Sequence, residues 1–317
     1  MKAIRFHEFG VADTLRVDEI ETPQHGANDV LIKTSVAGIN YADIMLRQGK
    51  YFFRPPLPFV PGFEVAGTIE AVGDNVTNLQ TGQRVLAMMG GGGYAEYAVA
   101  PAARVFPILD NLDFGAATAL LVQGLTALGL IQDLRAGQSI LIHAAAGGVG
   151  SLLVQLAKGR GARVLGMASS PEKLEKVVNL GADAAINYTE SDWTKQVLEA
   201  TGGKGADLII EMVGGEIGKR NFECLATKGT MIVYGAASGS DFQISGVSLM
   251  GKMHIVKGYN LNLETPENIG HFSRELVQSF ADGNLKVMVT EFPLEQAAEA
   301  HRAIEGRKTT GKVVLTV

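Results

Sequence analysis

Cysteine is nearly absent from this sequence, since Cys224 is the only one among 317 residues. A single cysteine cannot form an intramolecular disulfide, and it cannot supply the several thiolates of a cysteine-rich zinc site. Long apolar runs are missing too: the longest, 116–131, is interrupted by Gln123, Gly124 and Thr126 and is too short to span a membrane. The first residues alternate like a strand and lack the features of a signal or transit peptide. We therefore expect a cytoplasmic protein with no membrane partner.

Excess positive charge is also absent. The formal net charge is −5, and the lysines and arginines are scattered along the chain. Nucleic acid is therefore not an expected partner. Hydrophobic residues make up 46% of the chain and charged residues 19%, which is enough apolar surface for a core without disulfides or metals. At roughly 150 residues per domain, the length predicts two domains.

Two kinds of hydrophobic pattern divide the chain. Up to about residue 104, short β-rich runs alternate with Gly and Pro, at 3–6, 30–36, 63–72, 84–87 and 94–99, with one short helix at 42–48. From 114 to 259, apolar runs at 139–143, 163–168, 184–187, 208–212 and 229–234 alternate with amphipathic helices at 149–160, 171–180, 193–201 and 217–225. Such βαβ alternation is typical of a Rossmann-type, doubly wound parallel sheet.

The last part of the chain does not extend this alternation. We expect a helix at 266–280, a strand at 287–292, a helix at 294–304 and a strand at 312–316. We assign them to the first domain, so that 1–120 and 265–317 form a mostly β catalytic domain and 121–264 forms an inserted nucleotide-binding domain. The fold class is α/β.

A glycine-rich turn joins the first apolar run of the inserted domain to its first helix. Residues 139–150 read SILIHAAAGGVG, a variant A-x-G-x-x-G in which Ala145 replaces the usual first glycine. In a strand-turn-helix context, such glycines let the backbone approach a pyrophosphate at the helix N-terminus. An ordinary strand-to-helix turn is the alternative, but the βαβ series that follows favours a dinucleotide site.

The residues about 20 positions further on indicate which dinucleotide binds. An NAD site would carry Asp or Glu there, whereas this chain has Ser169, Ser170 and then Lys173. Hydroxyls and an ammonium group can donate to the extra phosphate of NADPH, which a carboxylate would repel. We therefore predict NADPH as the cofactor, with a solvated Lys173 as the alternative for that residue. Tyr188 closes the next strand pattern. The sequence is equally compatible with a packing role for its side chain and with a contact to the adenosine end of the nucleotide.

Four segments together resemble one protein family. They are GINYADIMLRQGKY at 38–51, PGFEVAG at 61–67, QGLTA at 123–127 and HAAAGGVG at 143–150. In this order they are similar to the medium-chain dehydrogenase/reductase superfamily, and within it to its quinone oxidoreductase and ζ-crystallin branch. The resemblance implies that the first domain is GroES-like.

The zinc enzymes of that superfamily bind the metal through a cysteine in the first segment and a histidine in the second. Here Asn40 and Phe63 occupy those places, and neither can ligate zinc as thiolate or imidazole does. We expect no metal site. An enzyme without zinc lacks the Lewis acid that assists alcohol oxidation. The resemblance therefore implies hydride donation from NADPH to an acceptor activated by conjugation, which is the activity of an NADPH:quinone oxidoreductase.

The resemblance also implies roles for individual residues. The catalytic candidates are Asn40, Arg47 and Tyr51, and Asp43 would fix the local turn. Apart from the resemblance, we expect Glu64 to be a structural carboxylate satisfied by backbone donors or an arginine, with a catalytic role as the alternative. Asn40 and Thr126 would line the nicotinamide half of the cofactor. The remaining cofactor contacts would come from Gly147, Gly148, Val149 and Gly150 at the pyrophosphate, from Ser169, Ser170, Lys173, Tyr188 and Arg307 at the adenosine phosphate, and from Tyr234, Gly235, Ala236, Gly258, Tyr259 and Asn260 along the nicotinamide ribose.

Two other functions remain open from the sequence. One is an NADPH-dependent double-bond reductase of alkenals, enones or 2-enoyl thioesters, in which Tyr51 would donate a proton. The other is a non-catalytic NADPH-binding protein. The alternative for Tyr51 is that it only packs over the substrate cleft. The strand expected near 254–257 ends the parallel series and would leave an apolar edge, so we also predict a homodimer joined through that edge.

Overall fold

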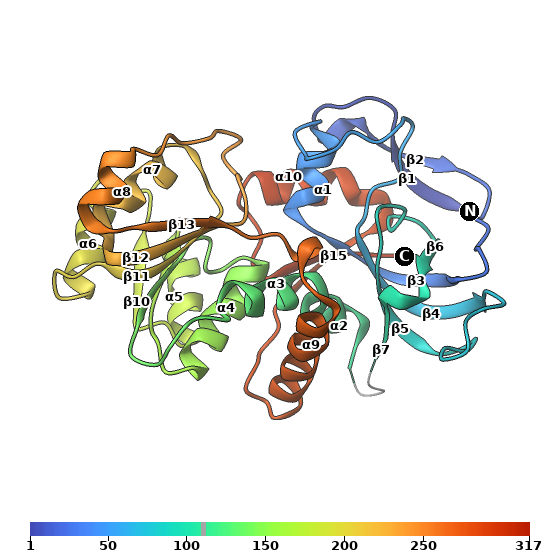
Figure 1. The fold of residues 1–317 in the computed structure, drawn as a ribbon. Coiled ribbons are helices and arrows are strands. Elements are labelled where there is room, and N and C mark those ends of the chain that lie inside the picture. The colour runs from blue at the N-terminus through green and yellow to red at the C-terminus, as the bar shows by residue number, and fades with distance from the viewer. Residues whose placement is uncertain (109–111) are drawn as a thin grey trace. The chain divides into compact units, whose positions relative to one another are not determined.

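The computed structural model describes residues 1–108 and 112–317, and it divides into two compact units (Figure 1). The first unit contains Met1–Val122 and Met288–Val317, and the second contains Gln123–Val287. The second unit is therefore an insertion between two segments of the first. Among the described residues, no helix combines the length and apolar character needed to cross a membrane.

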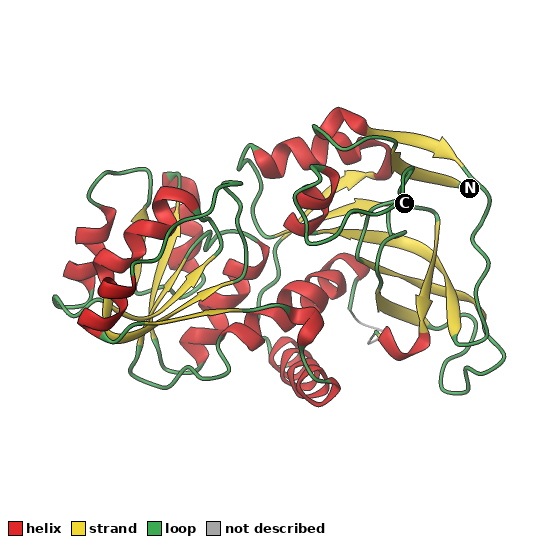
Figure 2. Ribbon diagram, turned by 45° about the horizontal axis from the view of Figure 1, so that its top comes forward, coloured by secondary structure: helices red, strands yellow, loops and turns green. Residues whose placement is uncertain are grey.

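The first unit is built on a seven-stranded sheet (Figure 2). In spatial order the strands are β14 (Val289–Pro293), β15 (Lys312–Thr316), β3 (Asp29–Ile39), β4 (Glu64–Val72), β5 (Arg84–Met88) and β7 (Val105–Pro107), and β6 (Tyr97–Pro101) also pairs with β3. Buried and more exposed residues alternate through much of β3, as expected of an antiparallel strand with one face on the core. A separate hairpin pairs β1 (Lys2–Phe6) with β2 (Leu15–Glu19).

The C-terminal strand completes this sheet, because β15 pairs antiparallel with β3. This pairing brings the two ends of the chain into one core, whose buried members include Phe6, Ile32, Val65 and Leu315. The helices of the unit are α1 (Tyr41–Arg47), α2 (Phe114–Ala119) and α10 (Ala297–Glu305), with short 3-10 turns η1 (Ala12–Thr14), η2 (Ala102–Arg104) and η5 (Leu294–Gln296).

The second unit is a six-stranded sheet in which every neighbouring pair is parallel. Its spatial order is β10 (Ala184–Asn187), β9 (Arg163–Ala168), β8 (Ser139–Ile142), β11 (Ala206–Glu211), β12 (Leu225–Val233) and β13 (Ile255–Gly258). All residues of β8 are buried, as is typical of a central parallel strand covered on both faces.

Helices cover both faces of this sheet, with α4 (Gly148–Gly159) and α5 (Pro171–Asn179) on one side and α6 (Trp193–Ala200) and α7 (Gly215–Cys224) on the other (Figure 1). The unit also contains α3 (Leu125–Leu130), α8 (Gly246–Lys252), α9 (Pro266–Ala281) and the 3-10 turn η4 (Leu261–Leu263). The π-helical turn η3 (Leu120–Gly124) crosses the boundary between the units.

The predicted α/β fold class is confirmed: a doubly wound parallel sheet is inserted into a mostly β domain. The β strands at 163–168, 184–187 and 312–316 match their predicted bounds, whereas β2, β7 and α8 had no counterpart in the sequence pattern.

The position of α9 differs from the sequence assignment, which placed all of 265–317 in the first domain. The structure groups α9 with the second unit, and the chain returns to the first at Met288. The reason lies in side-chain contacts. Leu276 packs so closely on Gly124 that a Cβ there would lie 3.0 Å from Leu276 Cδ1. The Arg160 Nη2 atom also lies 3.1 Å from Glu275 Oε1.

Candidate functional site

The carboxyl edge of the parallel sheet carries most of the predicted cofactor residues. The chain leaves β8 toward β9 and β10 on one side, and after β10 it continues with β11, β12 and β13 on the other. In doubly wound sheets, ligands bind at this switch point, outside the carboxyl ends of the strands. The segments that follow the strands here are the glycine turn after β8, Ser169 and Ser170 after β9, Tyr188 after β10, Tyr234, Gly235 and Ala236 after β12, and Tyr259 and Asn260 after β13.

The glycine turn is shaped to receive an anion. Gly147 is the N-cap of α4 and provides no side-chain hydrogen bond to the first turn of the helix. Gly147, Gly148 and Val149 are partly exposed. An uncapped helix N-terminus offers backbone N–H groups and a positive dipole end, which suit a phosphate. The residues present therefore fit the pyrophosphate of a dinucleotide.

Close packing explains why glycines stand in this turn. A Cβ on Gly150 would lie 2.2 Å from the carbonyl oxygen of Ala144, and one on Gly148 would lie 2.0 Å from Gln123 Oε1. Gln123 is buried, and its Oε1 has no hydrogen-bond partner among the described residues. The motif at 123–127 contains Gln123, but no local pattern indicates a role for its side chain. Its contact with the glycine turn makes it a further candidate residue of this edge.

The predicted adenosine-phosphate residues are only partly brought together. Ser169 and Ser170 follow β9 and lie beside Tyr188, whose amide nitrogen is 3.3 Å from the Ala168 oxygen. Lys173 is partly buried in the first turn of α5. The Ser170 hydroxyl interacts with Glu172 and lowers the pKa of that carboxyl group. Arg307 belongs to the first unit, so its place in this group stays a prediction.

The predicted nicotinamide-ribose residues follow β12 and β13. Tyr234 donates its amide hydrogen to Glu211 O at 3.0 Å, and burial, with the Glu211 charge, raises the pKa of the Tyr234 phenol. The Tyr259 hydroxyl lies against α3, where a Cβ on Gly129 would be 1.9 Å from it. Asn260 uses its side chain to cap η4, accepting from the Asn262 amide at 3.0 Å. Its predicted contact with the cofactor would therefore have to come from its remaining donors.

A buried polar network lies at the end of β11, and the sequence patterns do not predict it. The Glu211 carboxylate is fully buried and accepts from the Gly214 amide at 2.7 Å, from the Val213 amide and from Asn221 Nδ2. Asn221 Oδ1 in turn lies 2.9 Å from His143 Nε2. The network ties the loop after β11 to the residue that begins the glycine turn. Its members are separated by up to 78 positions along the chain, so no local pattern indicates it.

In the first unit, Asn40 stands at the junction of β3 and α1. It is the N-cap of α1, and its side chain and that of Asp43 form a reciprocal capping box. The Asp43 carboxylate accepts from the Asn40 amide at 2.8 Å and from the Gly62 amide at 3.0 Å. Burial raises the pKa of Asp43 to about 7, although these hydrogen bonds and the charge of Lys312 act in the opposite direction. The expected role of Asp43 in fixing this turn agrees with its contacts.

Glu64 is a buried carboxylate with a backbone donor, as the sequence analysis expected, but its charged partner is a lysine and not an arginine. It is 0% exposed, accepts from Asn40 Nδ2 at 2.7 Å and from the Val122 amide at 3.0 Å, and forms an ion pair with Lys312. Lys312 begins β15 and is 1% exposed. The sequence pattern around Lys312 indicates only the start of a strand.

Tyr51 lies in an aromatic cluster on the first unit. Its ring centroid is 4.8 Å from that of Phe52, 5.6 Å from Phe53 and 5.7 Å from Phe63. Phe52 is 82% exposed, so the cluster presents an apolar aromatic surface to solvent. Burial, with a smaller effect of Asp43, raises the pKa of Tyr51. The phenol is therefore protonated near neutral pH and can donate a hydrogen bond.

Arg47 and Thr126 are buried. Arg47 is 0% exposed, and its Nη2 donates to Glu305 Oε1 at 2.6 Å. Its catalytic role stays a prediction, and the hydrogen bond of its guanidinium group to Glu305 on α10 gives that role no support. Thr126 is 8% exposed on α3 and belongs to the second unit, whereas Asn40 belongs to the first. Their shared contact with the nicotinamide also stays a prediction.

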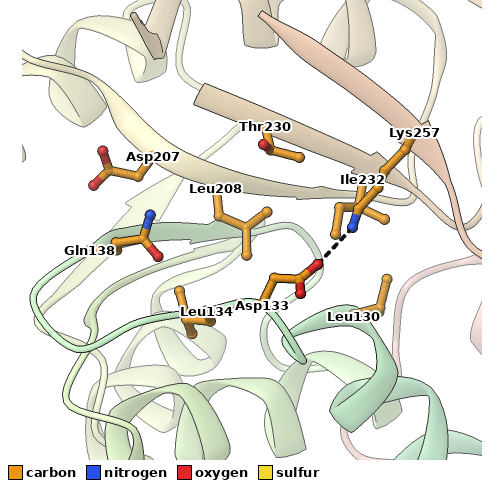
Figure 3. A pocket seen from close by; sticks show the side chains of 9 residues that line it. All are labelled: Leu130, Asp133, Leu134, Gln138, Asp207, Leu208, Thr230, Ile232 and Lys257. Carbon is orange, nitrogen blue, oxygen red and sulfur yellow. Dashed lines mark hydrogen bonds and ion pairs between the residues drawn. The ribbon is translucent and has the colours of Figure 1, made fainter. Parts of the chain in front are cut away.

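A separate hollow in the second unit lies beside the beginnings of β8 and β11 (Figure 3). It is lined by Leu130, Asp133, Leu134, Gln138, Asp207, Leu208, Thr230, Ile232 and Lys257. Lys257 Nζ and Asp133 Oδ2 form an ion pair of 3.1 Å at this hollow. Because Gln138 precedes β8 and Asp207 lies near the start of β11, the hollow is at the opposite end of these strands from the glycine turn. We assign it no part of the nucleotide site.

Metal-ligating side chains are not gathered in the described part of the chain, where no group of three or more His, Cys, Asp or Glu residues is arranged to hold an ion. At the two places where zinc relatives carry ligands, Asn40 is bonded to Glu64, and Phe63 packs on Tyr51.

Comparison with known families agrees with this fold. Residues 26–110 match the alcohol dehydrogenase GroES-like domain, and residues 148–274 match the family described as zinc-binding dehydrogenase. A parallel, nucleotide-binding sheet inserted into a GroES-like domain defines the class of medium-chain dehydrogenases/reductases.

Full-length comparisons narrow this class. Quinone oxidoreductase from Mus musculus is 35% identical, and the match covers 99% of this chain and 97% of that protein. The structure of Escherichia coli quinone oxidoreductase complexed with NADPH has a TM-score of 0.95 at 30% identity, covering both chains completely. CurK enoyl reductase has a TM-score of 0.89 at 27% identity, covering 99% of this chain and 98% of that one. The chain belongs to the quinone oxidoreductase family.

Proposed function

We propose that this chain is an NADPH-dependent quinone reductase that works without zinc. The observation that carries the proposal is the carboxyl edge of the parallel sheet, where an uncapped helix N-terminus at Gly147 adjoins Ser169, Ser170 and Lys173 in place of a carboxylate. Family membership and the NADPH complex of the Escherichia coli relative support the same cofactor and acceptor.

The protein's own residues bind and orient the reactants. When bound, NADPH supplies the hydride. The backbone N–H groups at the start of α4 hold the pyrophosphate, and the hydroxyl and ammonium groups after β9 hold the adenosine phosphate. Asn40 and Tyr51 offer an amide and a phenol to the acceptor. A quinone is already activated by conjugation, so its reduction does not depend on the alkoxide stabilisation that zinc provides in alcohol oxidation.

A second candidate is an NADPH-dependent reductase of conjugated double bonds. The partly buried phenol of Tyr51 and the likeness to CurK enoyl reductase favour it. NADPH consumption measured in parallel with a quinone, an alkenal and an enoyl thioester separates the two candidates. Turnover of the quinone supports the first proposal, preference for the other substrates supports the second, and no turnover with any of them leaves a non-catalytic NADPH-binding protein.

Cofactor choice gives the first specific prediction. If Ser169 and Lys173 bond the adenosine phosphate, with charge-assisted bonds of about 1.5–3 kcal/mol each, NADPH should bind at least about tenfold more tightly than NADH. Lys173→Glu should weaken NADPH binding by about tenfold or more and leave NADH within about twofold, because NADH lacks that phosphate. Fluorescence titration with both nucleotides measures this.

Lys176→Glu is the matched control, since Lys176 lies one turn further along α5 and is exposed. It makes the same charge change on the same helix, and we expect little effect on either nucleotide. An equal loss of NADPH and NADH binding in Lys173→Glu would contradict the assignment.

Assembly gives the second prediction: a homodimer in the cytoplasm. Within the described residues β13 pairs only with β12 and is therefore an edge strand, and its first residue, Ile255, is 54% exposed. Open apolar edges favour pairing with another chain. We expect light scattering at micromolar concentration to give a dimer.

Ile255→Lys should shift this dimer toward monomer, because lysine on an edge strand opposes edge-to-edge pairing. Leu263→Lys is the control, since Leu263 is 82% exposed in η4 and outside the strand. A wild-type monomer, or a dimer unaffected by Ile255→Lys, would rule out this edge as the interface.

A further inference from the structure

A buried ion pair borders Asn40 in the first unit. Glu64 is 0% exposed and Lys312 is 1% exposed, and their charged groups are in direct contact. Gly38 makes room for the carboxylate, since a Cβ there would lie 2.5 Å from Glu64 Oε1. Replacing such a pair with apolar residues is often neutral or stabilising. Stability alone is therefore a weak reason for two charges at this place.

The pair bonds both ends of the Asn40 carboxamide. Asn40 Nδ2 donates to Glu64 Oε1 at 2.7 Å, and Lys312 Nζ donates to Asn40 Oδ1 at 3.2 Å. A carboxylate can only accept and an ammonium group can only donate. The two partners therefore permit one orientation of the amide, and a flipped amide would face each partner with the wrong group.

This orientation leaves one donor of Asn40 available. One hydrogen of Nδ2 is bound by Glu64, and no contact among the described residues uses the second. The carboxamide oxygen, in contrast, accepts from Lys312 and takes part in the capping box of α1. Asn40 is thus held so that its free group is an N–H.

We propose that Lys312 and Glu64 are positioning residues that hold Asn40 as a hydrogen-bond donor toward the quinone oxygen. This rests on the proposed function. In that reaction the quinone gains a hydride, one of its oxygens takes the negative charge, and a proton from water completes the hydroquinone while NADPH becomes NADP⁺. A preorganised donor lowers the energy of the developing charge, and losing one such donor typically costs about 10²–10³ in kcat.

The test removes both charges at once. Glu64→Gln/Lys312→Met removes both members of the ion pair, whereas either single change would leave one of them buried without its partner. The new amide at position 64 can either accept or donate, and a thioether at position 312 cannot donate to Asn40 Oδ1, so that only the capping box of α1 still constrains the orientation of the Asn40 amide. We expect a melting temperature and NADPH affinity near wild type and a fall in kcat with a quinone of about tenfold or more. Glu64→Gln/Lys312→Gln is the second neutral pair, to be used if the first does not fold.

A double-mutant cycle with Asn40→Ala separates positioning from a general structural role. If the pair acts through Asn40, removing it in the Asn40→Ala background should not lower kcat further. An independent, additive fall would overturn the proposal, as would a kcat within about twofold of wild type in the folded neutral pair.

Two controls complete the design. Arg84→Met removes a partly buried cation from the same sheet. Arg84 Nη2 donates to Leu112 O and not to Asn40, so this variant should leave kcat unchanged. Wild-type turnover of the quinone with NADPH is measured first. Its absence would refute the proposed function, whereas normal wild-type turnover with unaffected variants would refute only the positioning role.

Discussion

Gly150→Ala should weaken NADPH binding by about a hundredfold or more, while Gly159→Ala in the same helix should leave it unchanged. A Cβ on Gly150 would lie 2.2 Å from Ala144 O and 2.8 Å from Ala145 Cα, and both are backbone atoms that cannot rotate away. The start of α4 must then move from the strand end. Losing two charge-assisted bonds of about 1.5–3 kcal/mol each raises the Kd of NADPH by about a hundredfold or more.

The control position is well matched, because Gly159 ends α4 and a Cβ there meets nothing within 4 Å. Isothermal titration of both variants measures the Kd, and thermal unfolding shows whether the fold survives. Gly148→Ala provides an intermediate case, since the atoms nearest to its Cβ would be those at the end of the Gln123 side chain, which can move. NADPH affinity near wild type in Gly150→Ala would exclude this turn as the pyrophosphate site.

Tyr51→Phe should lower kcat by about a hundredfold or more with an enoyl substrate, the usual size of a general-acid contribution, and only slightly with a quinone. Hydride addition to an enoyl group leaves an enolate, whose charge a phenol stabilises and whose carbon must be protonated. A reduced quinone is a stable anion that takes its proton from water. The raised pKa of Tyr51 keeps the phenol protonated for either role.

Steady-state kinetics with both substrate classes decide between these outcomes. Tyr97→Phe is the control, because Tyr97 is a partly exposed tyrosine on β6 of the same unit. A large loss confined to enoyl turnover would favour the double-bond reductase. Quinone turnover near wild type, with negligible enoyl activity before mutation, would support the quinone reductase. An equal large loss with quinone would contradict the idea that a quinone needs no protein acid.

Local patterns in the sequence were sufficient for the nucleotide-binding part of the molecule. Strand periodicity located every strand of the parallel sheet within a few residues, and SILIHAAAGGVG placed the glycine turn at the start of α4. These features are local, since each strand, turn and helix start depends on residues close together in the chain. The absence of zinc ligands at Asn40 and Phe63 was equally visible, because it depends only on residue type.

Other features depended on contacts between distant segments. Lys312 meets Glu64 across 248 positions only because β15 pairs with β3 and β3 pairs with β4. The hydrogen bond between Arg47 and Glu305 on α10 likewise joins residues that are 258 positions apart. The amino-acid sequence by itself therefore determined the fold class, the dinucleotide turn and the loss of metal ligands. Tertiary structure alone decided which buried charges meet and that both of them bond the Asn40 carboxamide, because pairing between strands far apart in sequence leaves no local pattern.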